Sequence, residues 1–139
     1  PRRKEVPISI FCMRYIVDTH SLVWYFTKDE RLSNRAKRIL QEAEDGRNEL
    51  IVPAIVLLEA IDISEKKKVV FKIEKLFSFI EERDNFQIVD VNFVLIKELV
   101  RLGRGLDLHD RIILTVSKLS DGIILTRDSQ LKKFTKVIW

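Results

Sequence analysis

Cysteine is almost absent from this 139-residue chain, which has Cys12 alone. A single cysteine excludes an internal disulfide and a cysteine-ligated zinc cluster, and two histidines are too few for a histidine-rich metal site. This cysteine usage fits a reducing, cytoplasmic setting. The four glycines form neither a Walker A loop nor a dinucleotide-binding fingerprint, so the sequence excludes these two nucleotide-binding motifs as well.

Long hydrophobic runs are also missing. The longest, residues 51–58, contains Pro53 and ends at Glu59, well short of the roughly 18 residues that a membrane span requires. Hydrophobic residues make up 46% of the chain and are spread along its whole length, which is typical of a folded domain with one core. We therefore expect no transmembrane helix.

A large excess of one charge is absent too. The formal net charge is +4, and residues 1–13, with three basic residues and one acidic residue, carry half of it. Because this segment differs in composition from the rest, we interpret residues 1–13 as an appended or alternatively started N-terminal extension. Residues 14–139 then form one domain that is only weakly basic.

Short β-rich runs alternate with amphipathic helical patterns along this domain. The runs are mostly continuous apolar, as in a parallel sheet that is buried on both faces. They are residues 15–17, 50–52, 86–89, 123–125 and 137–139. Strands separated by helices require crossover connections, so the pattern predicts a three-layer α/β fold with ligands bound at the carboxyl ends of the strands.

Three apolar stripes predict helices between these runs. Ser33 is suited to cap the first, and Gly46 to end it. The other two stripes are Val69, Ile73, Leu76, Phe77 and Ile80, and Leu95, Ile96, Leu99 and Val100. In a helix over residues 69–81, Phe71 and Phe79 lie away from the stripe, so they would suit a protein interface unless a second core layer buries them.

Four acidic residues stand beside or within apolar segments. Asp18 and Asp128 follow the first and fourth β-rich runs, where each has a simpler interpretation as a helix N-cap. Asp110 opens an apolar helical run, and Asp107 has cap spacing relative to it. Glu59 interrupts a helix that is apolar on almost every face, with no basic residue within a turn, so it requires a partner from elsewhere in the chain.

Together the four acids predict a metal site, because the first and fourth strands are neighbours in many doubly wound sheets. Carboxylates that share a pocket repel one another unless a cation neutralises them. Mg²⁺ and Mn²⁺ favour such all-oxygen shells, and an ion bound there activates water and stabilises charge on a phosphodiester. Helix caps plus one salt-bridged glutamate remain the alternative interpretation.

Four motifs follow one another in the order Asp18 to Trp24, Glu59 in its apolar helix, Asp107 to Arg111, and Leu125 to Asp128. In this order they resemble the PIN-domain nucleases, and among these the VapC-type toxins of prokaryotic toxin–antitoxin pairs. The resemblance extends from about residue 14 to residue 139. It implies an α/β/α sandwich with a central five-stranded, mainly parallel sheet, and an endoribonuclease that depends on Mg²⁺ or Mn²⁺.

The resemblance assigns both catalysis and metal binding to the same four acids, Asp18, Glu59, Asp110 and Asp128. Family members commonly have a proline-phenylalanine pair before the third acid, where this chain has Leu108-His109, and an arginine after it, kept here as Arg111. The departure leaves Asp107 as an alternative third acid. Thr19 and Ser21 would orient a ligand or a metal-bound water, unless they serve as helix caps.

The resemblance also implies partners: an RNA substrate, a cognate antitoxin protein and a second copy of the chain in a homodimer. Basic residues outside the acidic motifs are the candidates for RNA phosphates, namely Lys66, Lys67, Lys68, Arg101, Arg104, Lys132, Lys133 and Lys136. His20 and His109 could contact RNA or a metal, but a surface or structural role is the more common one for such histidines. The alternative function is a PIN-like binding module or scaffold without catalysis.

Overall fold

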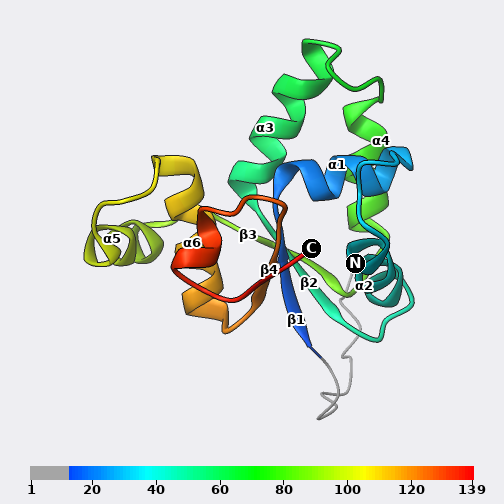
Figure 1. Cartoon of the computed structure of the whole chain (residues 1–139). Coiled ribbons are helices and arrows are strands. Elements are labelled where there is room, and N and C mark those ends of the chain that lie inside the picture. The colour runs from blue at the N-terminus through cyan, green and yellow to red at the C-terminus, as the bar shows by residue number, and fades with distance from the viewer. Residues whose placement is uncertain (1–12) are drawn as a thin grey trace.

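The computed structural model describes residues 13–139, so the extension predicted over residues 1–13 lies, apart from Met13, outside the described residues. Within residues 13–139, one sheet of five parallel strands has the order β3-β2-β1-β4-β5 (Figure 1). The strands are β1 (Arg14–Val17), β2 (Glu49–Pro53), β3 (Phe86–Val89), β4 (Ile123–Leu125) and β5 (Val137–Ile138). The parallel sheet and the pairing of the first strand with the fourth are both confirmed.

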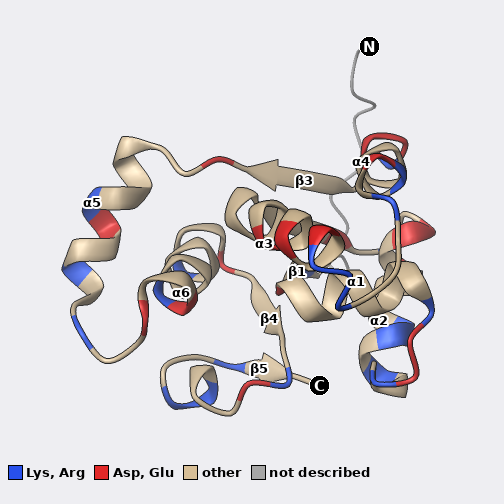
Figure 2. Ribbon diagram, turned by 90° about the horizontal axis from the view of Figure 1, so that it is seen from above, with Lys and Arg blue, Asp and Glu red and all other residues tan. Residues whose placement is uncertain are grey.

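Helices cover both faces of this sheet, which confirms the predicted three-layer α/β/α architecture. They are α1 (Thr19–Thr27), α2 (Asn34–Glu44), α3 (Ala54–Glu65), α4 (Ile73–Glu81), α5 (Phe93–Leu102) and α6 (Leu108–Ser120), with a short 3₁₀ helix η1 (Leu131–Lys133). Helices α1, α2 and α4 lie on one side and α5 and α6 on the other, while α3 projects beyond the edge at which the strands end (Figures 1 and 2).

The core lies between the central strands and the helices on either face. Ile16 and Val17 of β1, Leu50 of β2 and Ile124 of β4 are fully buried, because helices cover both faces of the strands that carry them. Ser33 caps α2 as predicted, with its hydroxyl oxygen accepting the Ala36 amide at 3.1 Å. None of the helices in residues 13–139 has the length and apolar character of a membrane-crossing helix.

The helix predicted over residues 69–81 begins four residues later than expected. After α3 the chain reverses at Lys67, which has a left-handed φ of 53°, and it is extended at Lys72, the N-cap of α4. Phe71 and Phe79 are half-buried against the core, each with its ring against Phe26 at centre distances of 6.2 and 5.4 Å. These two aromatics therefore belong to a second core layer and do not form an exposed interface.

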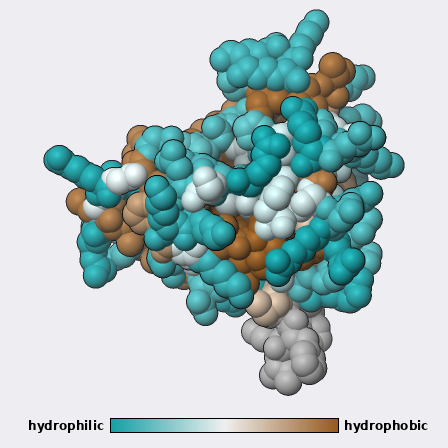
Figure 3. All heavy atoms as spheres, viewed as in Figure 1, coloured by the Kyte–Doolittle hydropathy of each residue, from teal (hydrophilic) through white to brown (hydrophobic). Residues whose placement is uncertain are grey.

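The apolar stripe predicted for α5 is only half buried. Leu95 and Leu99 are buried, whereas Ile96 is 44% exposed and Val100 is 67% exposed. Among the residues described, α5 packs chiefly against α6 and makes no comparable contact with the sheet, so a narrow strip of its surface is covered. Phe93, 71% exposed, extends the uncovered side, which Figure 3 shows as brown atoms on the left of the molecule.

Candidate functional site

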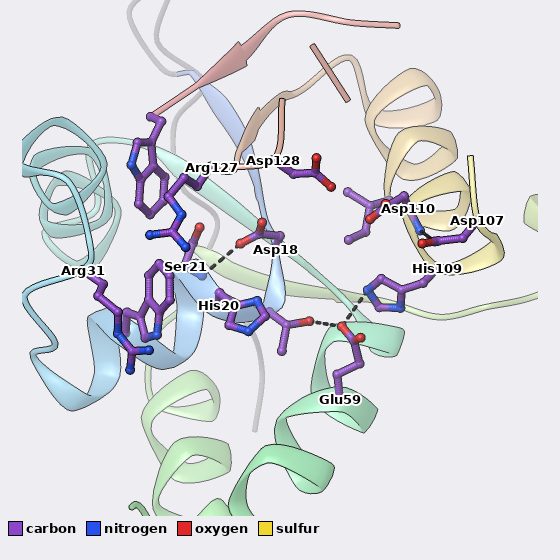
Figure 4. A pocket seen from close by; sticks show the side chains of 14 residues that line it. Asp18, His20, Ser21, Arg31, Glu59, Asp107, His109, Asp110, Arg127 and Asp128 are labelled. Atoms are coloured by element: carbon purple, nitrogen blue, oxygen red, sulfur yellow. Dashed lines mark hydrogen bonds and ion pairs between the residues drawn. The ribbon is translucent and has the colours of Figure 1, made fainter. Parts of the chain in front are cut away.

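A cavity of about 540 Å³ opens where β1 and β4 end and α1, α3 and α6 begin or pass by. Its walls contain five carboxylates, those of Asp18, Glu59, Asp107, Asp110 and Asp128. The parallel sheet brings them together, because the carboxyl ends of its strands lie at one edge. All four acids selected from the sequence therefore line one pocket, together with the alternative third acid (Figure 4).

Asp18 serves as a helix cap and as part of the pocket at the same time. One carboxylate oxygen accepts the Ser21 amide of α1 at 2.9 Å, and the other accepts the hydroxyl of Thr126, which follows β4. Each oxygen retains a second lone pair. The cap and the metal-site interpretations of Asp18 are thus compatible, and the cap fixes the direction of the carboxylate.

Thr19 and Ser21 play different parts beside this acid. The fully buried Ser21 hydroxyl donates to the Leu125 carbonyl oxygen at 3.1 Å, which ties α1 to β4. Ser21 is therefore not the helix cap, which is Asp18, and its role toward a ligand stays a prediction. The Thr19 hydroxyl donates to Glu59 instead, so it connects α1 to α3 and holds a pocket acid in place.

The partner of Glu59 is His109 on α6. The sequence indicated that Glu59 needs a partner but not which residue it is. His109 Nε2 lies 2.6 Å from Glu59 Oε1, a contact that fits a structural role for this histidine beside a pocket acid. Burial raises the pKa of Glu59, but hydrogen bonds from His109 and Thr19 outweigh burial and leave the pKa below its usual value. The same hydrogen bond raises the pKa of His109. Since 42% of the Glu59 side chain is exposed, this carboxylate borders the pocket and is not enclosed by apolar residues.

The first turn of α6 presents two acids with different surroundings. Asp107 is the N-cap, and its side chain accepts the Asp110 amide at 2.9 Å. The carboxylate of Asp110 has no hydrogen bond or ion pair within the described part of the chain. Burial, followed by the charges of Asp107 and Asp128, raises the pKa of Asp110 to about 6, and Asp18 adds to the shift. The neighbouring acids therefore add to the effect of burial on Asp110, and the charge of His109 offsets part of it.

Asp128 and Arg111 complete the motifs singled out in the sequence. Asp128 is held at the turn after β4, where its carboxylate accepts the Gln130 amide at 2.9 Å and its own amide donates to the Thr126 hydroxyl at 3.0 Å. Arg111 points away from this set of interactions, since its Nε and Nη2 donate to the Leu99 carbonyl oxygen at 3.0 and 2.8 Å. Arg111 therefore fastens α6 to the end of α5.

The donor chemistry of the pocket fits a hard divalent cation. Carboxylate oxygens are the ligands that Mg²⁺ and Mn²⁺ prefer. The pKa of Asp110 is raised first by burial and then by the charges of Asp107 and Asp128, which a bound cation would offset. In the side-chain conformations seen, no three acidic, histidine or cysteine side chains of residues 13–139 converge closely enough to hold one ion. Glu59 is among those turned to another partner.

Two arginines and two tryptophans in the pocket wall were not foreseen. They are Arg31, Arg127, Trp24 and Trp139. None of the lysines and arginines proposed from the sequence as RNA contacts lines this pocket, and two of them are engaged elsewhere, Lys66 with Asp62 and Arg101 with Glu98. One signal in the sequence was the position of Arg127, two residues after the fourth β-rich run and directly before a pocket acid.

Comparison with known proteins supports the fold. A chain in the crystal structure of VapBC2 from Rickettsia felis bound to a DNA fragment from their promoter is similar over 91% of this chain and 96% of its own, with 20% identity and a TM-score of 0.58. A chain of a toxin–antitoxin complex from Klebsiella pneumoniae is similar over 90% and 96%, with 19% identity and a TM-score of 0.64. No curated protein matches the sequence. The model of the PIN domain matches residues 15–137, and the chain therefore belongs to the PIN-domain family.

Proposed function

We propose that this protein is a metal-dependent endoribonuclease and the toxin of a VapBC-type toxin–antitoxin pair. The observation that carries the proposal is that Asp18, Glu59, Asp110 and Asp128 line one pocket. The family contributes the reaction class, since PIN domains are typically nucleases. The similar solved structures, both containing toxin–antitoxin complexes, support the toxin assignment.

The four acids would hold Mg²⁺ or Mn²⁺, which supplies Lewis-acid activation of water and neutralises charge that develops on the phosphodiester. Asp18 is oriented in advance, because the Ser21 amide and the Thr126 hydroxyl fix its carboxylate. Asp110 stands ready to contribute negative charge without breaking a hydrogen bond of its carboxylate. Products with a 5′-phosphate and a 3′-hydroxyl are expected, as in similar metal nucleases.

A cleavage assay on defined RNAs tests this assignment. The wild-type protein is expected to cut RNA with Mn²⁺ or Mg²⁺ and not with EDTA. Asp18→Asn and Asp110→Asn keep the side-chain size and are expected to lower the rate at least about a hundredfold, a loss typical for a group that supports a catalytic metal. Asp62→Asn, an exposed acid of α3 outside the pocket, is the matched control and should retain the wild-type rate.

Two results would contradict the assignment. Metal-dependent cleavage that survives in both pocket variants would remove these acids from the reaction. Wild-type protein that binds RNA but never cuts it, with either metal, would instead favour the PIN-like binding module without catalysis.

We further infer a cognate antitoxin and a homodimer as protein partners. The uncovered side of α5, with Phe93 and Val100 largely exposed, is a candidate surface for a second copy, because apolar surface of this kind is usually buried in an interface. Sedimentation of the wild type as a dimer and of Val100→Asp as a monomer would support the second copy, whereas a wild-type monomer would contradict it. The antitoxin is tested by expression in cells. Expression of this protein without the antitoxin gene should arrest growth, and co-expression of the antitoxin should relieve the arrest.

A further inference from the structure

The pocket has a second wall that the four acids do not explain. Arg31, between α1 and α2, and Arg127, after β4, place their guanidinium carbons 4.8 and 5.1 Å from the centre of the same Trp24 ring. Trp139 meets this ring with 6.0 Å between ring centres. Figure 4 shows Arg31 and Arg127 on the left, Asp110 on the right, and Asp18 between the two sides. We refer to Arg31, Arg127 and Trp24 as the arginine wall.

The two arginines of this wall have unused donors. Asp29 accepts from Nε and Nη2 of Arg31 at 3.0 and 2.7 Å, which holds the guanidinium in place and leaves its Nη1 without a hydrogen bond in the described residues. The side chain of Arg127 has neither an ion pair nor a hydrogen bond within residues 13–139, and only its contact with Trp24 holds it. Trp24 is 3% exposed, and its buried Nε1 likewise lacks a partner there.

Asp29, the partner of Arg31, is the one acid that pairs with either guanidinium in the described residues, and Arg127 has no such partner. Two guanidinium groups share one indole ring, so their like charges repel each other. The carboxylates of the pocket do not neutralise them, since no ion pair joins either arginine to Asp18, Asp110 or Asp128 among the described residues. An anion that contacts both arginines would remove the repulsion and use the free donors.

Phosphate is the anion that this chemistry favours. A guanidinium is a planar fork of donors that matches the oxygens of a phosphate. A nucleic acid strand carries a phosphate at each nucleotide, so a strand with one phosphodiester at the acids brings the next one close to the same pocket. The two walls therefore suit two successive phosphates, one cut with the help of the acids and one held by the arginines.

We propose that the arginine wall binds the phosphate of a single-stranded RNA that flanks the phosphodiester at the acids. This subsite rests on the proposed ribonuclease function and deepens it, because it gives the strand a position and a direction across the pocket. Single-stranded RNA fits better than a duplex, since the rings of the exposed His20 and the half-buried Trp139 adjoin the wall and unpaired bases stack on such rings.

Intrinsic fluorescence reports on this wall, because the chain has two tryptophans and both lie in it or against it. The full chain is titrated in EDTA, where no cleavage is expected, with a short single-stranded RNA at several salt concentrations. Arg127→Gln and Arg31→Gln are each expected to weaken binding roughly tenfold, as loss of a charge-assisted hydrogen bond to phosphate does. Each should also make the slope of log affinity against log salt shallower by about 0.7 for every phosphate that is no longer neutralised.

Arg47→Gln is the matched control. Arg47 pairs with an aspartate two residues earlier, as Arg31 does, but it precedes β2 and therefore lies at the opposite edge of the parallel sheet. Its affinity and salt dependence should remain those of the wild type. Circular dichroism of each variant checks the fold, and Arg127→Lys, which keeps the charge but loses the fork, should bind with intermediate affinity.

The outcomes separate the subsite from the reaction. In the cleavage assay with Mn²⁺, the arginine variants are expected to raise KM while kcat changes little, because the wall binds substrate and transition state equally. Variants that bind RNA as Arg47→Gln does, with an unchanged KM, would overturn the subsite while the nuclease assignment stands. Weakened RNA binding in a protein that never cuts RNA would support the subsite and overturn the reaction.

A further titration addresses a protein ligand. An acidic peptide with the same charge as the RNA is added to the wild type and to Arg127→Gln under the same conditions. If the substitution weakens binding of the peptide and leaves binding of the RNA unchanged, the wall binds protein carboxylates and the proposed phosphate subsite is wrong. If only RNA binding is weakened, the phosphate subsite is supported.

Discussion

Asp18 and Asp110 line the same pocket but are held in opposite ways. Both oxygens of Asp18 accept hydrogen bonds from the fold itself, from the Ser21 amide and the Thr126 hydroxyl. The Asp110 carboxylate has no such bond in the described residues, and its pKa is raised to about 6 by burial and by its acidic neighbours. Asp18 therefore stabilises the fold even without a ligand, whereas Asp110 destabilises it unless a cation is bound.

The largest stability change is expected at Asp18. Asp18→Ala removes the cap of α1 and leaves the buried Thr126 hydroxyl without its acceptor, for a loss of about 2 kcal/mol in the free energy of unfolding. Asp18→Asn keeps an acceptor for the cap and should lose less than half of that. Urea denaturation in EDTA measures both, and an alanine variant as stable as the wild type would show that the cap contributes nothing.

A smaller effect of opposite sign is expected at Asp110. Asp110→Asn removes a partly buried carboxylate with acidic neighbours and should raise stability in EDTA at pH 7 by about 1 kcal/mol, after a discount because the residue is partly exposed to solvent. Because the folded state binds this proton more tightly than the unfolded state, the wild type loses stability as pH rises from about 4 to about 6.

The pH series provides the control for Asp110. The difference between the wild type and Asp110→Asn should vanish near pH 4, where the carboxyl group is protonated in the folded protein and becoming so in the unfolded one. A gain in stability that is the same at pH 4 and pH 7 would show that it does not come from this charge. Added Mn²⁺ should stabilise the wild type and not the variant.

The smallest effect concerns His109, which links the α6 side of the pocket to Glu59. His109→Phe keeps an aromatic ring but loses the ion pair, at a cost of roughly 0.5 kcal/mol at pH 6 for a partly exposed pair. The pKa of His109 is raised in the folded protein, so its contribution is fully present below the usual histidine pKa and disappears as pH rises through the folded-state pKa. Thermal unfolding at pH 6 and pH 9 measures this, and an equal cost at both would contradict it.

The sequence was most informative where one residue type has few explanations. Acids that follow buried strands predicted that the pocket lies where these strands end. A glutamate in an apolar helix predicted that another segment of the chain supplies its partner. The identity of that partner could not be read, because His109 reaches Glu59 only through the packing of α6 near α3, fifty residues away in sequence. Periodicity likewise marked the apolar side of α5 but not how much of it another helix covers.

The basic residues selected from the sequence as RNA contacts stay a prediction, which the lining of the pocket does not test. Runs such as Lys66 to Lys68 are conspicuous in a sequence, yet none of them lines the pocket, whereas the isolated Arg31 and Arg127 do. Their effect depends on the fold, which brings residues almost a hundred positions apart to one tryptophan ring. Charges that are neighbours in the sequence therefore do not reveal two arginines that only the folded chain brings together.

The pairing of β1 with β4 also has a consequence for biosynthesis. The hydrogen bonds that join Asp18 and Ser21 to Leu125 and Thr126 span 104 and 108 residues, so they form only after most of the chain has left the ribosome. Asp18 and Glu59 are made early, but the pocket that they share with Asp110 and Asp128 is completed late. A ribosome-bound chain that stops before β4 lacks Thr126 and Asp128 and therefore cannot complete this pocket.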